Sequence, residues 1–502
     1  MLDDVNKIMA LTDFVGQVLA RQGLVIDRII TMSGGAIQEN LRLDYSCADG
    51  EGGSLVLRTD AATLVAGSHE KADEFSVLAF VHSAGIKTPK PIALCLDVNI
   101  IGKPFILMEY LPGTTDFAQI RAGEKREELA IDLGRELAAI HRLSPTELSF
   151  LQPHTPDPVN SLIRQYRNFF DQEGVVRPVA EWAMRWCLIQ TEYCCSSAQT
   201  LVHGDFRTAN YLVEGGELAG ILDWEFSGWG DPYSDLGWFC ARCWRYGYED
   251  TPAGGIASRA SFYQGYGAVS GQEVDPARVK FWEVMALLRW LVIAIQQGER
   301  NYSGGERDLE LGLTGLIRPL EIEHMLLEMT APSFWTVETQ GKIVTPDQEA
   351  TASELLSELL SGRSLNFWAR EQVILRQLGQ QTDYDSSGCY SFGPGAEGTQ
   401  MAGQDKRALH KTIRISAAFN NMILKDSALG DTVPEKLERS DETSELITLR
   451  DKIRSSDYDR KGQLYQFLLR GSRSRLQVIS PASLTGYVAL LGDERNDSNG
   501  CP

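Results

Sequence analysis

The chain has 502 residues, of which 43% are hydrophobic, and its formal net charge is −20 at pH 7. This length predicts two or three domains with ordinary apolar cores, and the negative charge disfavours a nucleic-acid partner because a polyanion would be repelled. No apolar run approaches the roughly 20 residues that cross a bilayer. Asp3 and Asp4 stand where a secretory signal has basic residues. We therefore expect a cytoplasmic protein without a membrane partner.

The first part of the chain predicts a small sheet with two helices. Two segments have the apolar spacing of an amphipathic helix, and five have the short apolar runs of strands. The helical segments are residues 1–20 and 69–84, and the strands are 26–33, 41–47, 54–60, 92–98 and 103–111.

The pattern then becomes mostly helical, with the clearest helices at 126–143 and 281–297. A sheet-rich segment followed by a helical one is typical of an α+β fold, and we place the two lobes at 1–111 and 112–335. We expect the functional groups in the cleft between these lobes.

A separate C-terminal helical domain is predicted at 345–480. Its Gly/Ser-rich stretch at 383–406 has few apolar residues and is expected to be disordered. This domain carries no chemical motif, so its role stays open; a protein partner, if there is one, is expected to bind through it.

One stretch, LVHGDFRTANYLV at 201–213, places polar side chains between two short apolar strands. His203, Asp205 and Asn210 are costly to bury unless they are paired. A satisfied turn would explain them, since Asp and Asn hydrogen-bond their own backbone. A catalytic loop is the alternative.

A second motif, ILDWE at 221–225, favours the catalytic loop. It puts Asp223 at the end of an apolar strand, thirteen residues after Asn210. An amide and a carboxylate are oxygen ligands of the kind that Mg²⁺ takes, and Asp205 is left to accept a proton from an attacking hydroxyl. A His-x-Asp-x4-Asn sequence followed by a strand-terminal Asp is the spacing of protein-kinase-like phosphotransfer sites.

Together with GDPYSDLGW at 230–238, these motifs resemble the aminoglycoside phosphotransferase and choline kinase-like family. The resemblance covers about residues 25–330 and is strongest to the kinase-like domains associated with acyl-CoA dehydrogenases. It implies a two-lobed protein-kinase-like fold, with ATP (or GTP) as the phosphate donor. It also implies that Asp205 is the catalytic base and that Asn210 and Asp223 hold magnesium.

The same resemblance implies a nucleotide site in the N-terminal lobe. The segment SGGAIQENLRL matches a phosphate-covering loop, in which Gly34 and Gly35 let the backbone approach phosphates. The next strand carries Arg58 where protein kinases have a lysine. An arginine stays charged and could grip phosphate in a different geometry.

The helical partner of Arg58 would be Glu74, with Glu70 as the alternative. The segment LMEYL at 107–111, with Glu109 and Tyr110, fits the connection between lobes, where adenine would meet backbone groups.

Other polar residues near the motifs have more modest expected roles. We expect His203 to brace its loop rather than act as a base, and Asp231 and Asp235 to cap turns and helix starts. Arg207 either contacts phosphate or pairs with a nearby acid. Glu225 faces either the metal or the solvent.

The predicted function is therefore an ATP-dependent kinase that phosphorylates a hydroxyl group of a small molecule. The alternative is a catalytically weak nucleotide-binding regulatory or scaffold protein associated with acyl-CoA metabolism, which Arg58 and the C-terminal domain motivate. The motifs are shared by kinases of aminoglycosides, choline, sugars and hydroxyacyl compounds, so the acceptor stays open.

Overall fold

The computed structural model describes residues 5–32, 38–60, 67–151, 157–173, 177–195, 199–302 and 309–330. Gly34, Gly35 and the predicted C-terminal domain at 345–480 lie outside these residues. The chain divides into two compact units, of which the first comprises residues up to 158 together with 192–286. The second comprises 159–191 and the described residues from 287 onward.

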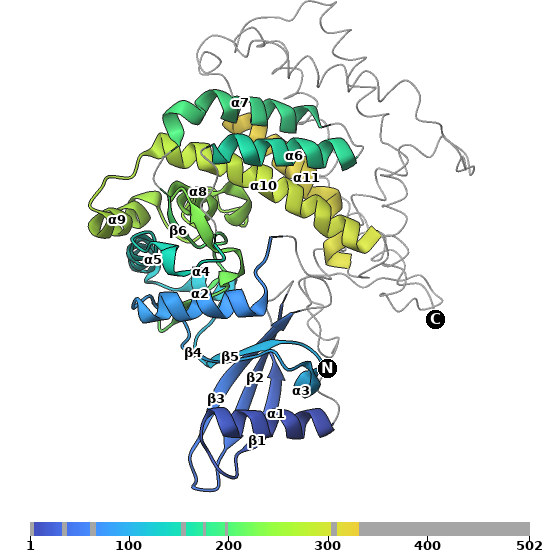
Figure 1. Cartoon of the computed structure of the whole chain (residues 1–502). Coiled ribbons are helices and arrows are strands. Elements are labelled where there is room, and N and C mark those ends of the chain that lie inside the picture. Colours follow the sequence, from blue (N-terminus) through green and yellow to red (C-terminus); the bar gives the residue numbers. More distant parts are fainter. Residues whose placement is uncertain are drawn as a thin grey trace, which may run out of the picture. The chain divides into compact units, whose positions relative to one another are not determined.

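The first unit begins with a five-stranded antiparallel sheet (Figure 1). All five strands predicted in this part of the chain are present, as is each of the two helices. In spatial order the strands are β1 (Val25–Thr31), β2 (Gln38–Ser46), β3 (Gly52–Asp60), β5 (Phe105–Glu109) and β4 (Pro91–Cys95). The helices are α1 (Val5–Val18), α2 (Lys71–Ser83) and the one-turn α3 (Val98–Ile101).

The two faces of the sheet differ because side chains alternate along each strand. One face packs Leu43, Leu57 and Phe105 against Leu11 and Val15 of α1, and all five are buried. The other face is polar near the ends of β2 and β3. This polar face lies toward α2, which supplies its own buried apolar side chains at its contact with β4 and β5.

The rest of the first unit is mainly helical, with two short strand pairs, β6 with β9 and β7 with β8. The predicted strands on either side of the motif at 203–210 are therefore confirmed, and so is the α+β class. The elements are α4 (Phe117–Ala122), α5 (Arg126–Ile140), β6 (Thr200–Val202), β7 (Tyr211–Glu214), β8 (Glu217–Ile221), β9 (Gly228–Gly230), α8 (Tyr233–Cys240), α9 (Arg259–Ser270) and the first part of α10 (Pro276–Tyr302).

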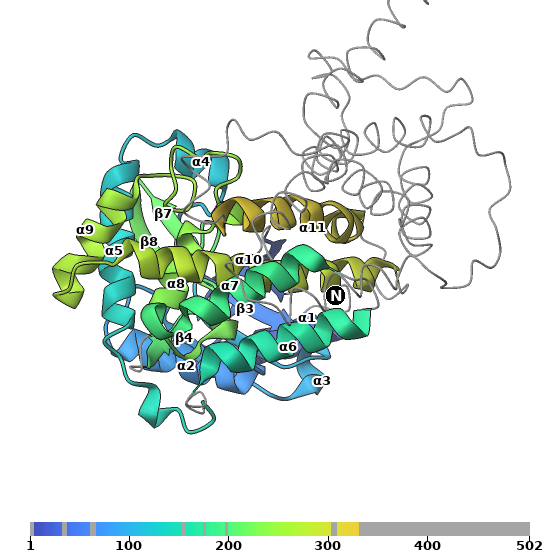
Figure 2. The same ribbon diagram turned by 90° about the horizontal axis from the view of Figure 1, so that it is seen from above.

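The second unit consists of α6 (Pro158–Glu173), α7 (Pro178–Cys194), the remainder of α10 and α11 (Leu309–Met329) (Figure 2). Arg167 of α6 donates to Glu181 of α7 at 3.0 Å. The indole of Trp182 donates to the Thr330 hydroxyl at 3.0 Å. Among the described residues, no helix combines the length and apolarity needed to span a membrane.

Helices α5 and α9 pack closely because glycines stand at their contact. A Cβ atom built on Gly265 would overlap the carbonyl oxygen of Ile131, which is backbone and has little room to move. We expect Gly265→Ala to lower the free energy of unfolding by about 1–3 kcal/mol, the range of overpacking in a core. Urea denaturation measures this change. The control is Gln264→Ala on the exposed side of the same helix. An unchanged midpoint of urea unfolding for Gly265→Ala would contradict the close packing of α5 and α9.

Candidate active site

The loop 203–210 joins β6 to β7. The conformation of its first three residues depends on the close approach of Gly204 to the backbone of Phe226. Gly204 has φ +80°, and a Cβ there would overlap the carbonyl oxygen of Phe226. Only glycine meets both conditions. The following residue, Asp205, is thereby placed at the start of the loop with its carboxylate buried.

His203 braces this loop, as predicted. Its Nδ1 accepts a hydrogen bond from the Asp205 N–H at 3.2 Å. Its Nε2 lies 2.8 Å from the carbonyl oxygen of Leu222. Because Nδ1 is an acceptor here, the network assigns the ring proton to Nε2. Both ring nitrogens are hydrogen-bonded within the protein, as expected of a residue that braces the loop.

Asp235, in the first turn of α8, is hydrogen-bonded to the same loop. Its carboxylate accepts the N–H groups of His203 at 2.7 Å and Gly204 at 2.9 Å. It also lies 3.1 Å from Nε2 of His141. Burial opposes ionisation, but the hydrogen bond and charge of His141 keep the pKa of Asp235 below its ordinary value.

The prediction that Asp235 caps a turn or a helix start is confirmed for a turn, because its carboxylate accepts backbone N–H groups of the loop and not those of its own helix. For Asp231 the prediction holds, since this residue accepts the Tyr233 N–H at the start of α8, at 2.9 Å.

The carboxylate of Asp205 is oriented by three side chains. The indole of Trp238 donates to Oδ1 at 2.8 Å. The Asn210 amide donates to Oδ2 at 2.6 Å and to the Asp205 carbonyl oxygen at 2.9 Å. Nε of Arg207 lies 3.2 Å from Oδ1. Since the amide nitrogen of Asn210 faces Asp205, its amide oxygen points to the opposite side.

Asp223 follows β8 at a residue with φ 71° and ψ 60°, a left-handed conformation that Asp tolerates better than most side chains. The N–H of Leu222 donates to the carbonyl oxygen of Asn210 at 2.8 Å, which brings the two predicted metal ligands onto neighbouring segments. Burial opposes ionisation of Asp223, but the charges of Arg58 and Arg207 hold its pKa below the ordinary value.

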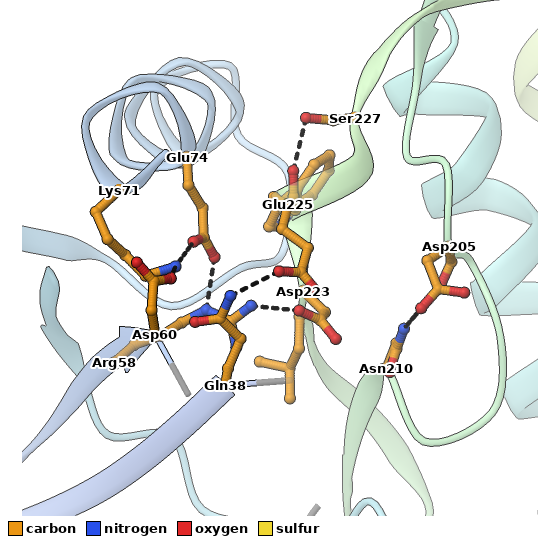
Figure 3. Close-up of polar contacts among 12 residues, drawn as sticks. Gln38, Arg58, Asp60, Lys71, Glu74, Asp205, Asn210, Asp223, Glu225 and Ser227 are labelled. Carbon is orange, nitrogen blue, oxygen red and sulfur yellow. Dashed lines mark hydrogen bonds and ion pairs between the residues drawn. The ribbon is translucent and has the colours of Figure 1, made fainter. Parts of the chain in front are cut away.

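Arg58 of β3 reaches both α2 and Asp223 (Figure 3). Its Nε donates to Glu74 Oε1 at 2.5 Å, and a terminal nitrogen donates to Asp223 Oδ1. The predicted pairing with Glu74 is confirmed, whereas Glu70 stands at the N-cap of α2. Burial lowers the pKa of Arg58, but the carboxylates of Glu74 and Asp223 raise it by more, so the guanidinium is charged.

Lys71 is a second cation at this point that the sequence reasoning missed. Its ammonium lies 2.6 Å from Glu74 and 2.9 Å from Asp60, and its side chain is buried. The spacing of Lys71 and Glu74, three residues apart on one helix, is a signal that could have found it. Glu74 therefore lies between two cations.

Glu225 has a buried partner that was not predicted. Its Oε2 accepts a hydrogen bond from Nε2 of Gln38 at 2.7 Å. The side chain is buried, so the solvent-facing alternative for Glu225 is wrong. Burial, together with the negative charge of Asp223, raises the pKa of Glu225 to about 7.

Aromatic side chains lie beside the Asp205 carboxylate. The Arg207 guanidinium, which pairs with Asp205, sits 4.7 Å from the ring centre of Trp244. Tyr246 donates its hydroxyl to the Thr208 carbonyl at 3.0 Å. Its ring stacks on Phe117 at 4.0 Å and remains 42% exposed. Of the two alternatives for Arg207, the structure contains the ion pair.

The segment predicted to meet adenine lies at the end of β5. The N–H of Glu109 donates to the carbonyl oxygen of Lys90 at 2.9 Å. The ring of Tyr110 lies under the Arg42 guanidinium, 4.2 Å from it. The adenine-binding role of Glu109 and Tyr110 stays a prediction.

The donor set fits magnesium bound together with a nucleotide. Asn210 and Asp223 provide one amide oxygen and one carboxylate, and Mg²⁺ is commonly held by one or two protein groups plus phosphates and water. Among the described residues, no group of three or more His, Cys, Asp or Glu side chains could hold a metal by itself. A metal here would take its remaining ligands from the nucleotide and from water.

These features define a kinase-like phosphotransferase fold. Residues 32–282, half of the chain, match the sequence profile of the phosphotransferase enzyme family. The chain belongs to this family, and the predicted resemblance is confirmed.

Two relatives are acyl-CoA dehydrogenase family members. Member 10 of Mus musculus is 34% identical over 197 residues, which are 37% of this chain and 18% of that protein. Member 11 of Pongo abelii is 29% identical over 189 residues, or 35% of this chain and 23% of that protein. The matching segment is thus about a fifth of the length of these relatives.

Among solved structures, a candidate aminoglycoside phosphotransferase from Ralstonia eutropha is similar in fold. The TM-score is 0.50 at 21% sequence identity, over 64% of this chain and 97% of that one. This likeness shows a shared fold.

Proposed function

We propose that this protein is a magnesium-dependent kinase that transfers a phosphoryl group from ATP to a hydroxyl group of a small molecule. The observation that carries the proposal is the carboxylate of Asp205, oriented by Trp238 and Asn210 on a loop adjacent to Asp223. Membership of the phosphotransferase enzyme family supports the reaction class.

Each residue then has a separate role. Asp205 accepts a hydrogen bond from the acceptor hydroxyl and later its proton, which directs the oxygen toward the phosphorus. Phosphoryl transfer is catalysed mainly by such positioning and by neutralising phosphate charge. Magnesium, held by Asn210 and Asp223, would supply that neutralisation. The exposed ring of Tyr246 would contact the body of the acceptor.

Arg58 is proposed to bind a phosphate of the nucleotide, and the backbone of Gly34 and Gly35 is proposed to bind phosphate as well. Its side chain is already fixed by Glu74, and Lys71 holds the other oxygen of that carboxylate. Donation to Asp223 occupies one oxygen of a proposed metal ligand. When nucleotide and metal bind, Arg58 and Asp223 would therefore separate, so that Arg58 contacts a phosphate and Asp223 contacts magnesium.

Arg58→Ala is expected to weaken nucleotide binding by about tenfold or more, the effect of losing a charge-assisted contact. Arg58→Lys should retain part of the affinity, because the charge survives while the planar fork is lost. Isothermal calorimetry with ATP and Mg²⁺ measures both. Arg28→Ala, an exposed arginine of β1, is the control. Wild-type affinity in Arg58→Ala would show that the side chain does not contact the nucleotide.

The function is tested by a nucleotide-consumption screen of the full chain over alcohols. Amino sugars, choline and hydroxyacyl-CoAs are included, the last because the relatives are named as acyl-CoA dehydrogenase family members. Each acceptor is assayed with ATP and with GTP, in Mg²⁺ and in EDTA, with Asp205→Asn as the blank. The proposal expects metal-dependent and Asp205-dependent release of nucleoside diphosphate for one acceptor class. A wild-type chain that binds neither nucleotide would overturn it.

The alternative, a catalytically weak regulatory protein or scaffold, is not favoured by the site. The hydrogen bonds that orient Asp205 come from two side chains besides Arg207, and regulation by nucleotide binding alone does not require them. The predicted protein partner of the C-terminal domain concerns residues outside the described ones.

A further inference from the structure

Gln38 is the first residue of β2 and faces the same side of the sheet as Arg58. In the β2–β3 register Gln38 is opposite Asp60, and Asn40 is opposite Arg58. Gln38 and Arg58 are therefore diagonal neighbours, whose side chains are within reach of each other. The Gln38 side chain is 5% exposed, so its amide must find its partners inside the protein or in a bound ligand.

The orientation of this amide is determined by Glu225. Nε2 of Gln38 donates to Glu225 Oε2 at 2.7 Å, across 187 positions of sequence. Glu225 is 2% exposed, and its carbonyl oxygen accepts the His69 N–H at 2.8 Å. When Glu225 is ionised, its carboxylate accepts only from the nitrogen end of the amide, which puts the oxygen Oε1 of Gln38 on the other side (Figure 3).

That oxygen is buried and has no hydrogen-bond partner within the part of the chain that the structure describes. An unpaired buried acceptor is unfavourable, so a group that can donate is expected there in the bound state. The ionised phosphates of a nucleotide carry no hydrogen-bond donor near neutral pH. Water molecules coordinated by Mg²⁺ are donors, and magnesium retains several of them when it binds protein and phosphate.

The surrounding contacts connect Gln38 to the proposed metal ligand. Glu225 is two residues from Asp223, and Arg58 donates to Asp223. We propose that Gln38 is a further binding residue for the magnesium–nucleotide complex, that its amide oxygen accepts a hydrogen bond from metal-bound water, and that Glu225 positions it. This inference rests on the proposed function.

The test compares nucleotide binding in Mg²⁺ and in EDTA by calorimetry. Gln38→Leu keeps the approximate volume and removes both ends of the amide. We expect it to weaken binding of ATP in Mg²⁺ by about tenfold, the effect of one hydrogen bond to a charged complex. Binding of metal-free ATP should be unchanged. Glu39→Gln, on the other face of the same strand, is the control and should match the wild type in both conditions.

A double variant, which we call the double exchange, keeps the test valid if Gln38→Leu fails to fold. In Gln38→Glu with Glu225→Gln, donor and acceptor change places, so the buried hydrogen bond is kept and residue 38 still presents a free acceptor oxygen. We expect this variant to bind ATP in Mg²⁺ within about threefold of the wild type, a difference below the worth of one hydrogen bond.

The inference is overturned if Gln38→Leu binds like the wild type in Mg²⁺, or if it loses the same factor in EDTA, which would indicate a purely structural role. It is also overturned if the double exchange binds as weakly as Gln38→Leu. A wild-type chain that binds neither ATP nor GTP would instead refute the proposed function, and this inference with it.

Discussion

Asp205→Asn is expected to lower the turnover of the acceptor by about 100-fold or more, the scale on which loss of a general base is felt. Asparagine keeps the shape of the side chain but cannot take the proton of the hydroxyl. Nucleotide affinity should stay close to that of the wild type, because Asp205 is not among the proposed nucleotide contacts. Steady-state turnover and calorimetric binding of ATP, measured on the same preparation, separate the two effects.

A milder variant separates loss of the Asp205 carboxylate from loss of its orientation. Trp238→Phe removes one donor to Asp205 and keeps the carboxylate. Its turnover should fall by about tenfold, as expected for the loss of one hydrogen bond to a charged group. If Asp205→Asn turns over a cognate alcohol as fast as the wild type, the loop is not catalytic, and the regulatory alternative gains support.

The second large effect is expected at Asp223. Asp223→Ala should abolish the increase in ATP affinity that Mg²⁺ produces and reduce turnover by at least about 100-fold, because the charge of the phosphates would no longer be neutralised in place. A titration of ATP binding against Mg²⁺ concentration measures the first effect.

Asp223→Asn is the matched variant for this test. Residue 223 has φ 71°, which strains alanine by roughly 1–2 kcal/mol but is tolerated by asparagine. Asparagine also keeps an acceptor for Arg58 while removing the negative charge that attracts the metal. Unchanged magnesium dependence in both variants would disprove Asp223 as a metal ligand.

Local sequence patterns predicted the strands, which depend on neighbours in the chain, and the family resemblance predicted one contact between separate elements. The strands that flank the loop at 203–210 follow from short apolar runs beside polar residues, and the pairing of Arg58 with Glu74 follows from the family resemblance. Both are present in the structure.

Apart from the pair Lys71 and Glu74, which are three positions apart, the contacts that were missed join residues far apart in the chain. Gln38 and Glu225 are 187 positions apart, and neither the strand pattern of one nor the DWE motif of the other indicates that they meet. The sequence predicts that Asp235 caps a turn or a helix start, but it does not indicate which backbone groups the carboxylate binds. Its true partners, 31 and 32 positions earlier, depend on how α8 packs against the loop.

The hydrogen bonds of Asp235 also join the loop to a segment that is distant in the sequence. Its carboxylate joins His203 to His141, which lies 94 positions before it in the sequence. Helices form locally and quickly, whereas contacts of such separation must first overcome the entropy of closing a long chain segment. A chain that has formed α5 and α8 but has not yet docked them lacks the support that orients Asp205. We therefore expect the support of Asp205 to form late in folding, after most of the secondary structure is in place.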